Sequence, residues 1–477
     1  MRAGARATMA ARHTMESSPG ESLPGRSEHR LAIVRRRDGG LDVLLAADER
    51  GWALPRADLP ERRSADVADL NRAVRAAFGL DASVLQCLAD APGAGGAPRR
   101  HLHVLEAHGG AGAPARWMPA DRASAALGAD AESWPRVEAW MRHASEAAAA
   151  RGAPAWARPG WRDEALGWVA GQLASRGWPP VSSVEQVRVW EFSQVLALDT
   201  AGGRFYFKAR PAWGAHEARL TRRLAERHPR SAPDVVAVDA DRGWLLMRAT
   251  AGRDLMEVDE LARWTAAAAS IAEMQIDWLD GVAELAALGC PQQSLSGLEA
   301  DVGPLLDDAA LLQPPLADRL GDEEVARLRR RRPELEALCR DLAAQGVPPS
   351  LEHGDLWAAN IIAAEDSNVV IDWEDAAIAH PFFSPALLAL SLDYTDALAR
   401  IPDAGARLRA AYLEPWARRG PLAGWTPRRL EEVFSLAGRV AMLYHAAQFR
   451  RSLARVETSW EVRAYAPLFL RRLLEAG

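Results

Sequence analysis

The pattern of the sequence changes at about residue 254, and this change constrains the fold more than any other feature. Before it, runs of β-branched and aromatic residues separated by turn sequences predict strands, with one helix among them. The predicted strands span 186–198, 204–209, 235–239 and 244–248, and the helix spans 215–226. After it the chain is almost wholly helical, as in 333–345, where apolar residues recur at i, i+3, i+4 and i+7. A small antiparallel sheet followed by a helical region predicts an α+β fold.

One short hairpin interrupts the helical region. The segments 361–363 and 369–372 are strand-like, and the polar sequence 365–368 between them is typical of a turn. A hairpin returns the chain to the place that it left, so we expect residues 360 and 372 to lie close together.

The first third of the chain predicts a separate small α/β domain. Its expected strands span 31–35, 41–45, 84–88 and 101–106, and its expected helices span 66–78 and 133–150. A Pro- and Gly-rich joint at 151–160 follows, and then a helix at 161–176. We therefore expect a disordered segment at 1–27, a domain at 28–150, a linker at 151–160, a strand-rich lobe at 161–250 and a helical lobe at 251–477.

Composition excludes several classes of protein. Apolar residues make up 49% of the chain and charged residues 26%, as in globular proteins, and no apolar run is long enough for a membrane span. Three scattered cysteines form no disulfide framework, and the N-terminus has no secretory apolar region, so we expect a cytoplasmic protein. A net charge of -6 without a sustained basic patch argues against a nucleic-acid partner. The sequence does not indicate the oligomeric state.

The chain contains a single lysine. Of its 58 basic residues all except Lys208 are arginine, so arginine replaces lysine wherever it can serve. A retained lysine indicates a role that needs a compact ammonium group and not a planar guanidinium. Chance retention on a surface strand is the alternative, and the lysine by itself does not decide between the two.

The run from His353 to Asn360, together with Asp372, carries the candidate chemistry. Phosphoryl transfer needs a group that accepts the proton of the attacking hydroxyl, ligands for Mg²⁺ and a cation on the phosphates. Asp355 is the candidate proton acceptor, and Asn360 and Asp372 are candidate metal ligands with the oxygen donors that Mg²⁺ prefers. We expect His353 to hold the loop by a structural hydrogen bond.

Lys208 supplies the missing cation. It ends a predicted strand, and Glu217 lies nine residues later in the first turn of the next predicted helix. A helix carboxylate that pairs with the strand lysine would hold the ammonium group toward the phosphates of ATP. This context favours a functional lysine over chance retention.

These residues resemble the aminoglycoside phosphotransferase and choline kinase family, a branch of the protein-kinase-like fold. The form His-Gly-Asp-x-x-x-x-Asn is met by 353–360, and an Ile-Asp-Trp-Glu-Asp-like metal motif is met by 371–375. The resemblance covers about 161–477 and implies a two-lobed fold that uses ATP and Mg²⁺ on a small-molecule acceptor. It also implies a nucleotide site that includes Ser193, Met247 and Ala249.

The sequence departs from that family in two places. The expected phosphate loop, 190–195, contains no glycine, and His380 begins the stretch where the family has an acidic residue before proline. The first departure affects nucleotide affinity, and the second predicts local repacking.

The N-terminal domain resembles the beginning of a Nudix hydrolase. Aligned on Gly79-Leu80, the chain keeps the arginine and the apolar residue of the Nudix box but lacks its glycine and its metal-binding glutamates. The retained positions are Arg72 and Val74, the glycine is replaced by Asp58, and the glutamates are replaced by Ser64, Ala73, Ala76 and Ala77. We expect a degenerate Nudix-like domain without hydrolase activity, used for binding or assembly, and an unrelated α/β domain is the alternative.

The main alternative for the whole chain is a nucleotide-binding pseudokinase with a regulatory role. Protein kinase activity is disfavoured by the long helical stretch at 254–345. Several other residues have ordinary explanations. His101 and His103 share one strand face, but no third ligand is near in the sequence, which makes a metal unlikely there. We expect His445 to be a packed residue, and Glu374 and Asp375 either attract a cationic substrate or cap the backbone.

Overall fold

We describe a computed structural model of the chain, which defines residues 25–38, 40–49, 51–61, 64–91, 98–110, 115–127, 132–145, 154–314, 319–456 and 465–475. Two compact units emerge: Glu16–Pro211 with Val456–Thr458, and Ala212–Arg455 with Ser459–Gly477 and Met1–Met15. We call them the first and second units and describe each by itself. The predicted domain boundaries at 150 and 250 stay predictions.

The first unit begins with a mixed sheet. Its strands and helices are β1 (Arg26–Arg37), β2 (Gly40–Asp48), β3 (Gly51–Ala53), β4 (Arg56–Pro60), β5 (Leu80–Ala91), β6 (Arg99–Gly110), β7 (Arg116–Pro119), α1 (Ala68–Phe78), α2 (Ala120–Ala126) and α3 (Trp134–Ser145). The strand order is β3-β2-β1-β6-β5, with β1 and β6 parallel. The elements predicted here are present and mostly longer, and 146–150 of the last predicted helix lie outside the described residues. Gly79 ends α1 in the left-handed conformation, as a C-terminal glycine does.

A helix and three strands complete the first unit: α4 (Trp161–Ala174), β8 (Val181–Val189), β9 (Gln194–Thr200) and β10 (Gly203–Ala209). The prediction of one strand at 186–198 was wrong, because a turn at 190–193 folds it into an antiparallel hairpin of β8 and β9. Apolar periodicity continues through this turn, so the pattern alone does not reveal it. The side-chain amide of Gln186 joins this hairpin to β5, since it both donates to and accepts from the backbone of Val84 (2.7 and 2.8 Å).

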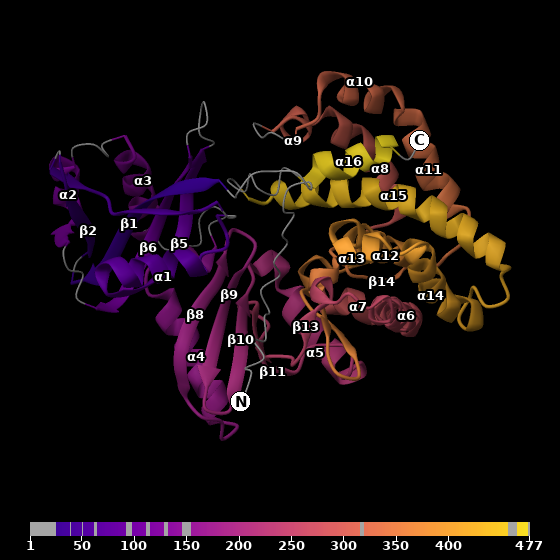
Figure 1. The fold of residues 1–477 in the computed structure, drawn as a ribbon, viewed down its shortest axis with the longest axis horizontal. Helices are drawn as coiled ribbons and strands as arrows, with labels where there is room; N and C mark the ends of the chain where they lie inside the picture. The colour runs from indigo at the N-terminus through magenta and orange to yellow at the C-terminus, as the bar shows by residue number, and fades with distance from the viewer. Residues whose placement is uncertain are drawn as a thin grey trace. The chain divides into compact units, whose positions relative to one another are not determined.

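The second unit starts with α5 (His216–Arg227) and the hairpin of β11 (Val235–Asp239) and β12 (Trp244–Arg248), where the sequence predicts them. Helices then dominate: α6 (Leu261–Asp277), α7 (Val282–Leu288), α8 (Leu295–Asp307), α9 (Ala309–Leu312), α10 (Asp322–Arg330), α11 (Arg332–Ala343), α12 (Ser384–Leu390), α13 (Asp396–Ala399), α14 (Ala404–Arg418), α15 (Pro427–Leu453) and α16 (Tyr465–Glu475). The long helix α15 runs beside α16 and α8 (Figure 1). The expected α+β architecture, a sheet region followed by a helical region, is confirmed.

Two short antiparallel ladders lie among these helices. The predicted hairpin is present as β15 (Ile361–Ala363) and β16 (Asn368–Val370), with β13 (Arg253–Asp254) on its other side. The second ladder pairs β14 (Ser350–Glu352) with β17 (Ala377–Ala379) and was not predicted, because each strand has only three residues. This ladder carries the chain into and out of the candidate site.

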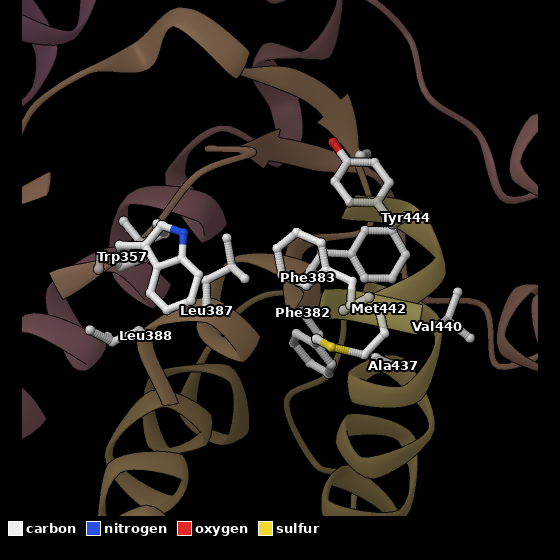
Figure 2. Packing of buried hydrophobic residues seen from close by; sticks show 14 of the residues in the cluster. Trp357, Phe382, Phe383, Leu387, Leu388, Ala437, Val440, Met442 and Tyr444 are labelled. Carbon is white, nitrogen blue, oxygen red and sulfur yellow. The ribbon is translucent and has the colours of Figure 1, made fainter. Parts of the chain in front are cut away.

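An aromatic core supports the same region from below. Phe382 and Phe383 lie against α15, where Figure 2 shows them beside Met442 and Tyr444. The rings of Phe383 and Tyr444 are 4.6 Å apart between centroids. The sequence predicts the start of α15, because Thr426 caps the helix by accepting a hydrogen bond from the N–H of Arg429 at 3.2 Å. Among the described residues no helix is long and apolar enough to span a membrane.

Candidate active site

The candidate catalytic loop leaves β14 at Glu352 and turns at Gly354. Gly354 has a φ angle of 82°, in the left-handed region that favours glycine. A Cβ atom at this position would collide with the backbone carbonyl of Asp375. The pairing of β14 with β17 holds the two segments at this distance. Glycine is therefore needed for the loop to pass directly over the turn Trp373–Asp375.

His353 connects this loop to the hairpin. Its Nδ1 atom accepts from the backbone N–H of Asp355 (3.2 Å), and its Nε2 atom lies 3.0 Å from the backbone oxygen of Ile371. Because Nδ1 accepts, Nε2 carries the proton and donates it to Ile371, so the ring is neutral. The ring also packs against Trp373, with centroids 4.6 Å apart. These contacts support the structural role that the sequence predicts.

Asn360 lies beside Asp355 and is oriented by it. The Asn360 Nδ2 atom donates to the backbone oxygen (2.8 Å) and to the carboxylate Oδ2 (3.1 Å) of Asp355. Its Oδ1 atom is buried and has no hydrogen-bond partner among the described residues. A buried carbonyl oxygen without a partner costs free energy unless something binds it, and an amide oxygen is a suitable Mg²⁺ ligand. Asn360 thus fits the metal role predicted for it.

Asp372 follows β16 and shares a cluster with two other acids. The N–H of Ile371 donates to the oxygen of Asn360 (2.9 Å), which brings the two ends of the hairpin together as the sequence predicts. Carboxylate oxygens of Glu217, Asp372 and Glu374 all lie within 4.8 Å of one another. Asp372 is in the left-handed conformation (φ 65°), which is uncommon for a residue other than glycine. Such backbone strain is concentrated at functional sites, and clustered carboxylates suit a hard divalent cation.

The approach of Glu217 to Asp372 and Glu374 was not predicted. The sequence suggested Glu217 as a partner of Lys208, and Glu374 as either a substrate contact or a cap. Because Glu217 lies more than 150 positions before Asp372 in the sequence, only the packing of α5 on the turn after Asp372 brings the two acids together. Both residues are therefore additional candidates for holding Mg²⁺.

Glu352 is a residue that the sequence reasoning missed. Its carboxyl group accepts from the N–H of Gly354 (3.2 Å), the N–H of Ser384 (3.0 Å) and the hydroxyl of Ser384 (2.7 Å). Burial raises the pKa of Glu352 to about 8, although these hydrogen bonds act in the opposite direction. The signal in the sequence was an acid in an otherwise apolar stretch directly before His353. Glu352 fixes the turn of the catalytic loop against the start of α12.

Helix α15 closes the site from behind. Gln448 donates from Nε2 to the backbone oxygen of Gly354 at 3.2 Å. His445 is buried one turn earlier, and burial lowers its pKa to about 4, so its ring is neutral at neutral pH. His445 is therefore a packed residue, as the sequence indicates. His380, where the family has an acid, is also buried, and its Nδ1 accepts from the N–H of Phe382 (3.2 Å), which is the expected local repacking.

The candidate nucleotide residues are divided between the two units. Lys208 near the end of β10 and Ser193 in the turn before β9 are buried residues of the first unit. Ser193 accepts a hydrogen bond from Nε1 of Trp190 at 2.8 Å, which orders this turn without glycine. Met247 is buried in β12 and Ala249 follows that strand, both in the second unit. The pairing of Lys208 with Glu217 stays a prediction.

The second unit thus presents an aspartate, an asparagine and three clustered carboxylates around one loop and one hairpin. A proton acceptor beside oxygen ligands for a divalent cation is the constellation of a phosphoryl-transfer enzyme. The comparison with protein families agrees. The model of the phosphotransferase enzyme family matches residues 183–433, more than half of the chain, and the protein belongs to this family.

Solved structures with a similar chain path include three kinases or relatives of kinases. A choline/ethanolamine kinase family protein from Mesorhizobium loti is 16% identical, with a TM-score of 0.44 over 66% of this chain and 94% of its own. Choline kinase LicA from Streptococcus pneumoniae is 13% identical (TM-score 0.43, 65% and 97%). Macrolide 2'-phosphotransferase MphH from Brachybacterium faecium is 16% identical (TM-score 0.42, 64% and 98%). No functionally curated protein matched the sequence.

The N-terminal resemblance is not confirmed. The family match begins at residue 183 and covers none of the predicted Nudix-like domain. Ala73, Ala76 and Ala77, which replace the expected glutamates, lie on α1, so this helix offers no carboxylate at those positions. A Nudix-like domain without hydrolase activity therefore stays a prediction.

Proposed function

We propose that this phosphotransferase uses Mg²⁺ and ATP to phosphorylate a hydroxyl group of a small molecule. The observation that carries the proposal is the state of Asn360, whose Nδ2 atom is held by Asp355 while its buried Oδ1 atom has no partner among the described residues. An amide fixed in this way presents an oxygen ligand next to the proton acceptor. Asp372, with Glu217 and Glu374 near it, supplies the negative charge that a divalent cation requires.

In this mechanism Asp355 orients the acceptor hydroxyl and takes its proton. The hydrogen bond from Asn360 to Oδ2 leaves the carboxylate fixed in one orientation, and His353 and Glu352 hold the backbone on either side of it. Positioning of this kind lowers the barrier because little reorganisation remains when the reaction occurs. Bound Mg²⁺ would supply charge neutralisation on the phosphates, with Asn360 and Asp372 as its ligands.

Lys208 completes the proposed nucleotide site from the first unit. Its ammonium group would hold the α- and β-phosphates, with Ser193 in the turn above them and the segment of Met247 and Ala249 at the adenine. A buried lysine on a strand, in a chain that otherwise uses arginine, supports this role.

An acceptor screen tests the proposal. Purified protein is incubated with Mg-ATP and aminoglycosides, choline, amino alcohols, sugars or macrolides, and ADP release and phosphorylated product are measured. We expect one class to be phosphorylated and the product to disappear in Asp355→Asn and Asp372→Asn. Asp366→Asn is the matched control, because Asp366 is an exposed acid in the turn of the same hairpin.

Two outcomes would contradict the proposal in different ways. Stabilisation by Mg-ATP without transfer to any acceptor would favour the nucleotide-binding pseudokinase. A complete absence of ATP turnover and of stabilisation by nucleotide, unchanged in Asp372→Asn, would exclude both.

A further inference from the structure

The sheet register of the first unit brings together four side chains that are far apart in sequence. His101 and His103 lie two residues apart on β6, on one face of the sheet. Cys87 on β5 is directly opposite His103, and His29 on β1 is directly opposite His101. The sequence argument against a metal rested on the lack of a third ligand near the two histidines. That premise was wrong, because the neighbouring strand supplies one.

The donor atoms are close enough for one ion. The Sγ atom of Cys87 and one ring nitrogen each of His101 and His103 lie within 4.8 Å of one another. Zn²⁺ takes thiolate sulfur at about 2.3 Å and imidazole nitrogen at about 2.0 Å, so small side-chain rotations bring all three atoms to one centre. The irregular register of β5 around Cys87 re-aims its side chain within the ladder.

The two histidines are buried in a way that hydrogen bonds within the described residues do not explain. Both ring nitrogens of His101 and the Nδ1 atom of His103 are buried without a hydrogen-bond partner, and the two residues are only 2% and 1% exposed. Burying a polar nitrogen without a partner costs on the order of 1–3 kcal/mol, and such groups are rare in native proteins. An ion that binds them removes this cost. Burial also lowers the pKa of His101 to about 4, so its ring is neutral and can act as a ligand.

Surrounding polar groups set the orientation of both rings. His103 Nε2 lies 3.1 Å from His29 Nδ1, and His29 Nε2 lies 2.9 Å from Ser27 Oγ. If Nε2–H of His103 donates to His29, and His29 in turn donates to Ser27, the Nδ1 lone pair of His103 is directed away from this chain and is available to an ion. Asp90 Oδ1 lies 3.5 Å from His101 Nδ1, which directs Nε2 of that ring to the same centre. A carboxylate or a second imidazole behind a ligating histidine is usual in metal sites.

We propose that Cys87, His101 and His103 bind one Zn²⁺ ion within the sheet of the first unit, with His29 and Asp90 as outer partners. One thiolate and two imidazoles form a nitrogen and sulfur donor set, which prefers Zn²⁺ to Mg²⁺. The ion would join β5 to β6, and through His29 to β1, so it stabilises the sheet. This site is separate from the oxygen-ligand cluster of the second unit and does not depend on the proposed phosphotransfer.

Cobalt and zinc binding to the full chain tests this proposal. The metal-free protein is titrated with Co²⁺ in excess Mg²⁺, which occupies the oxygen ligands of the other cluster. We expect one equivalent of Co²⁺ to give tetrahedral visible absorption together with a thiolate-to-metal charge-transfer band. Zn²⁺ should displace it stoichiometrically and raise the unfolding temperature.

Variants identify the ligands. Cys87→Ser should lose the charge-transfer band, His101→Gln and His103→Gln should weaken Zn²⁺ binding, and His29→Gln should weaken it by about 10–100-fold. His143→Gln is the matched control, since His143 is exposed on α3 of the same unit. Should a histidine variant fail to fold, the spectrum of Cys87→Ser still decides the question. Binding well below one equivalent, or a charge-transfer band that persists in Cys87→Ser, would overturn the proposal.

Discussion

The two candidate metal sites differ in chemistry and in how the chain builds them. The site of the second unit offers oxygen atoms from Asn360, Asp372 and neighbouring acids, whereas the site of the first unit offers one sulfur and two nitrogen atoms. The first of these is mostly written in one stretch of sequence, between His353 and Glu374. The other is assembled from three strands. A local hairpin fixes ligand spacing within a short stretch, whereas a sheet fixes it only through the pairing of distant strands.

The sites also differ in what they require from their surroundings. The oxygen site lies beside a loop held by Glu352, His353 and Gln448, so its geometry depends on several hydrogen bonds to the backbone. The proposed zinc site lies within a regular ladder, so its geometry depends on strand register alone. We therefore expect substitutions at the two sites to have separable effects, in the following order of size.

Loss of the proposed proton acceptor should have the largest effect. In Asp355→Asn we expect transfer to fall by about 10²–10⁴-fold, the usual contribution of general acid–base catalysis. Stabilisation by Mg-ATP and the bound zinc should persist, because the side chain keeps its shape. Initial rates with the acceptor found by the screen, nucleotide thermal shifts and metal content measure these three quantities. Loss of nucleotide stabilisation would instead show that Asp355 supports the fold of the loop.

A pair of ligand variants tests whether the two metal sites are independent. In Asn360→Ala the Mg²⁺ concentration for half-maximal activity should rise by about 10–100-fold, while zinc content is unchanged. In Cys87→Ser the reverse should hold, with zinc lost and the Mg²⁺ dependence of transfer preserved. Metal analysis and activity titrations on both variants check this. A change of both properties in either variant would contradict the separation.

Exchange of the single lysine should have a smaller effect. In Lys208→Arg we expect kcat/KM for ATP to fall by about tenfold, because the charge remains but a planar guanidinium replaces a compact ammonium group. Arg204→Lys, near the other end of β10, is the matched control and should leave kcat/KM unchanged. If Lys208→Arg behaves like the control, the lysine was retained by chance.

The smallest expected effect concerns stability and pH. Because the pKa of Glu352 is raised to about 8, its contribution to the free energy of unfolding is fully present below the ordinary glutamate pKa of 4.5 and is lost as pH rises through about 8. Glu352→Gln removes this titration, so the fall in stability between about pH 5 and pH 9 should be smaller than in the parent protein. Denaturant unfolding at both pH values measures the difference. Equal pH dependence in the two proteins would show that Glu352 does not titrate in this range.

The sequence by itself determined the parts of this protein that depend on neighbours along the chain. It predicted the hairpin that joins Asn360 to Asp372, the bounds of β11 and β12, and the change from strands to helices, because these follow from local pattern and turn residues. The family match supports the class of enzyme that the motif indicates.

Only the tertiary structure decided the rest. It divided 186–198 into two strands, paired β14 with β17, brought Glu217 to Asp372, and placed Cys87 opposite His103. Each of these depends on register or packing between segments that are not adjacent, and a shift of one residue would send every side chain of a strand to the other face. The candidate catalytic loop could therefore be found in the sequence, whereas the buried acid that supports it and the proposed zinc site could not.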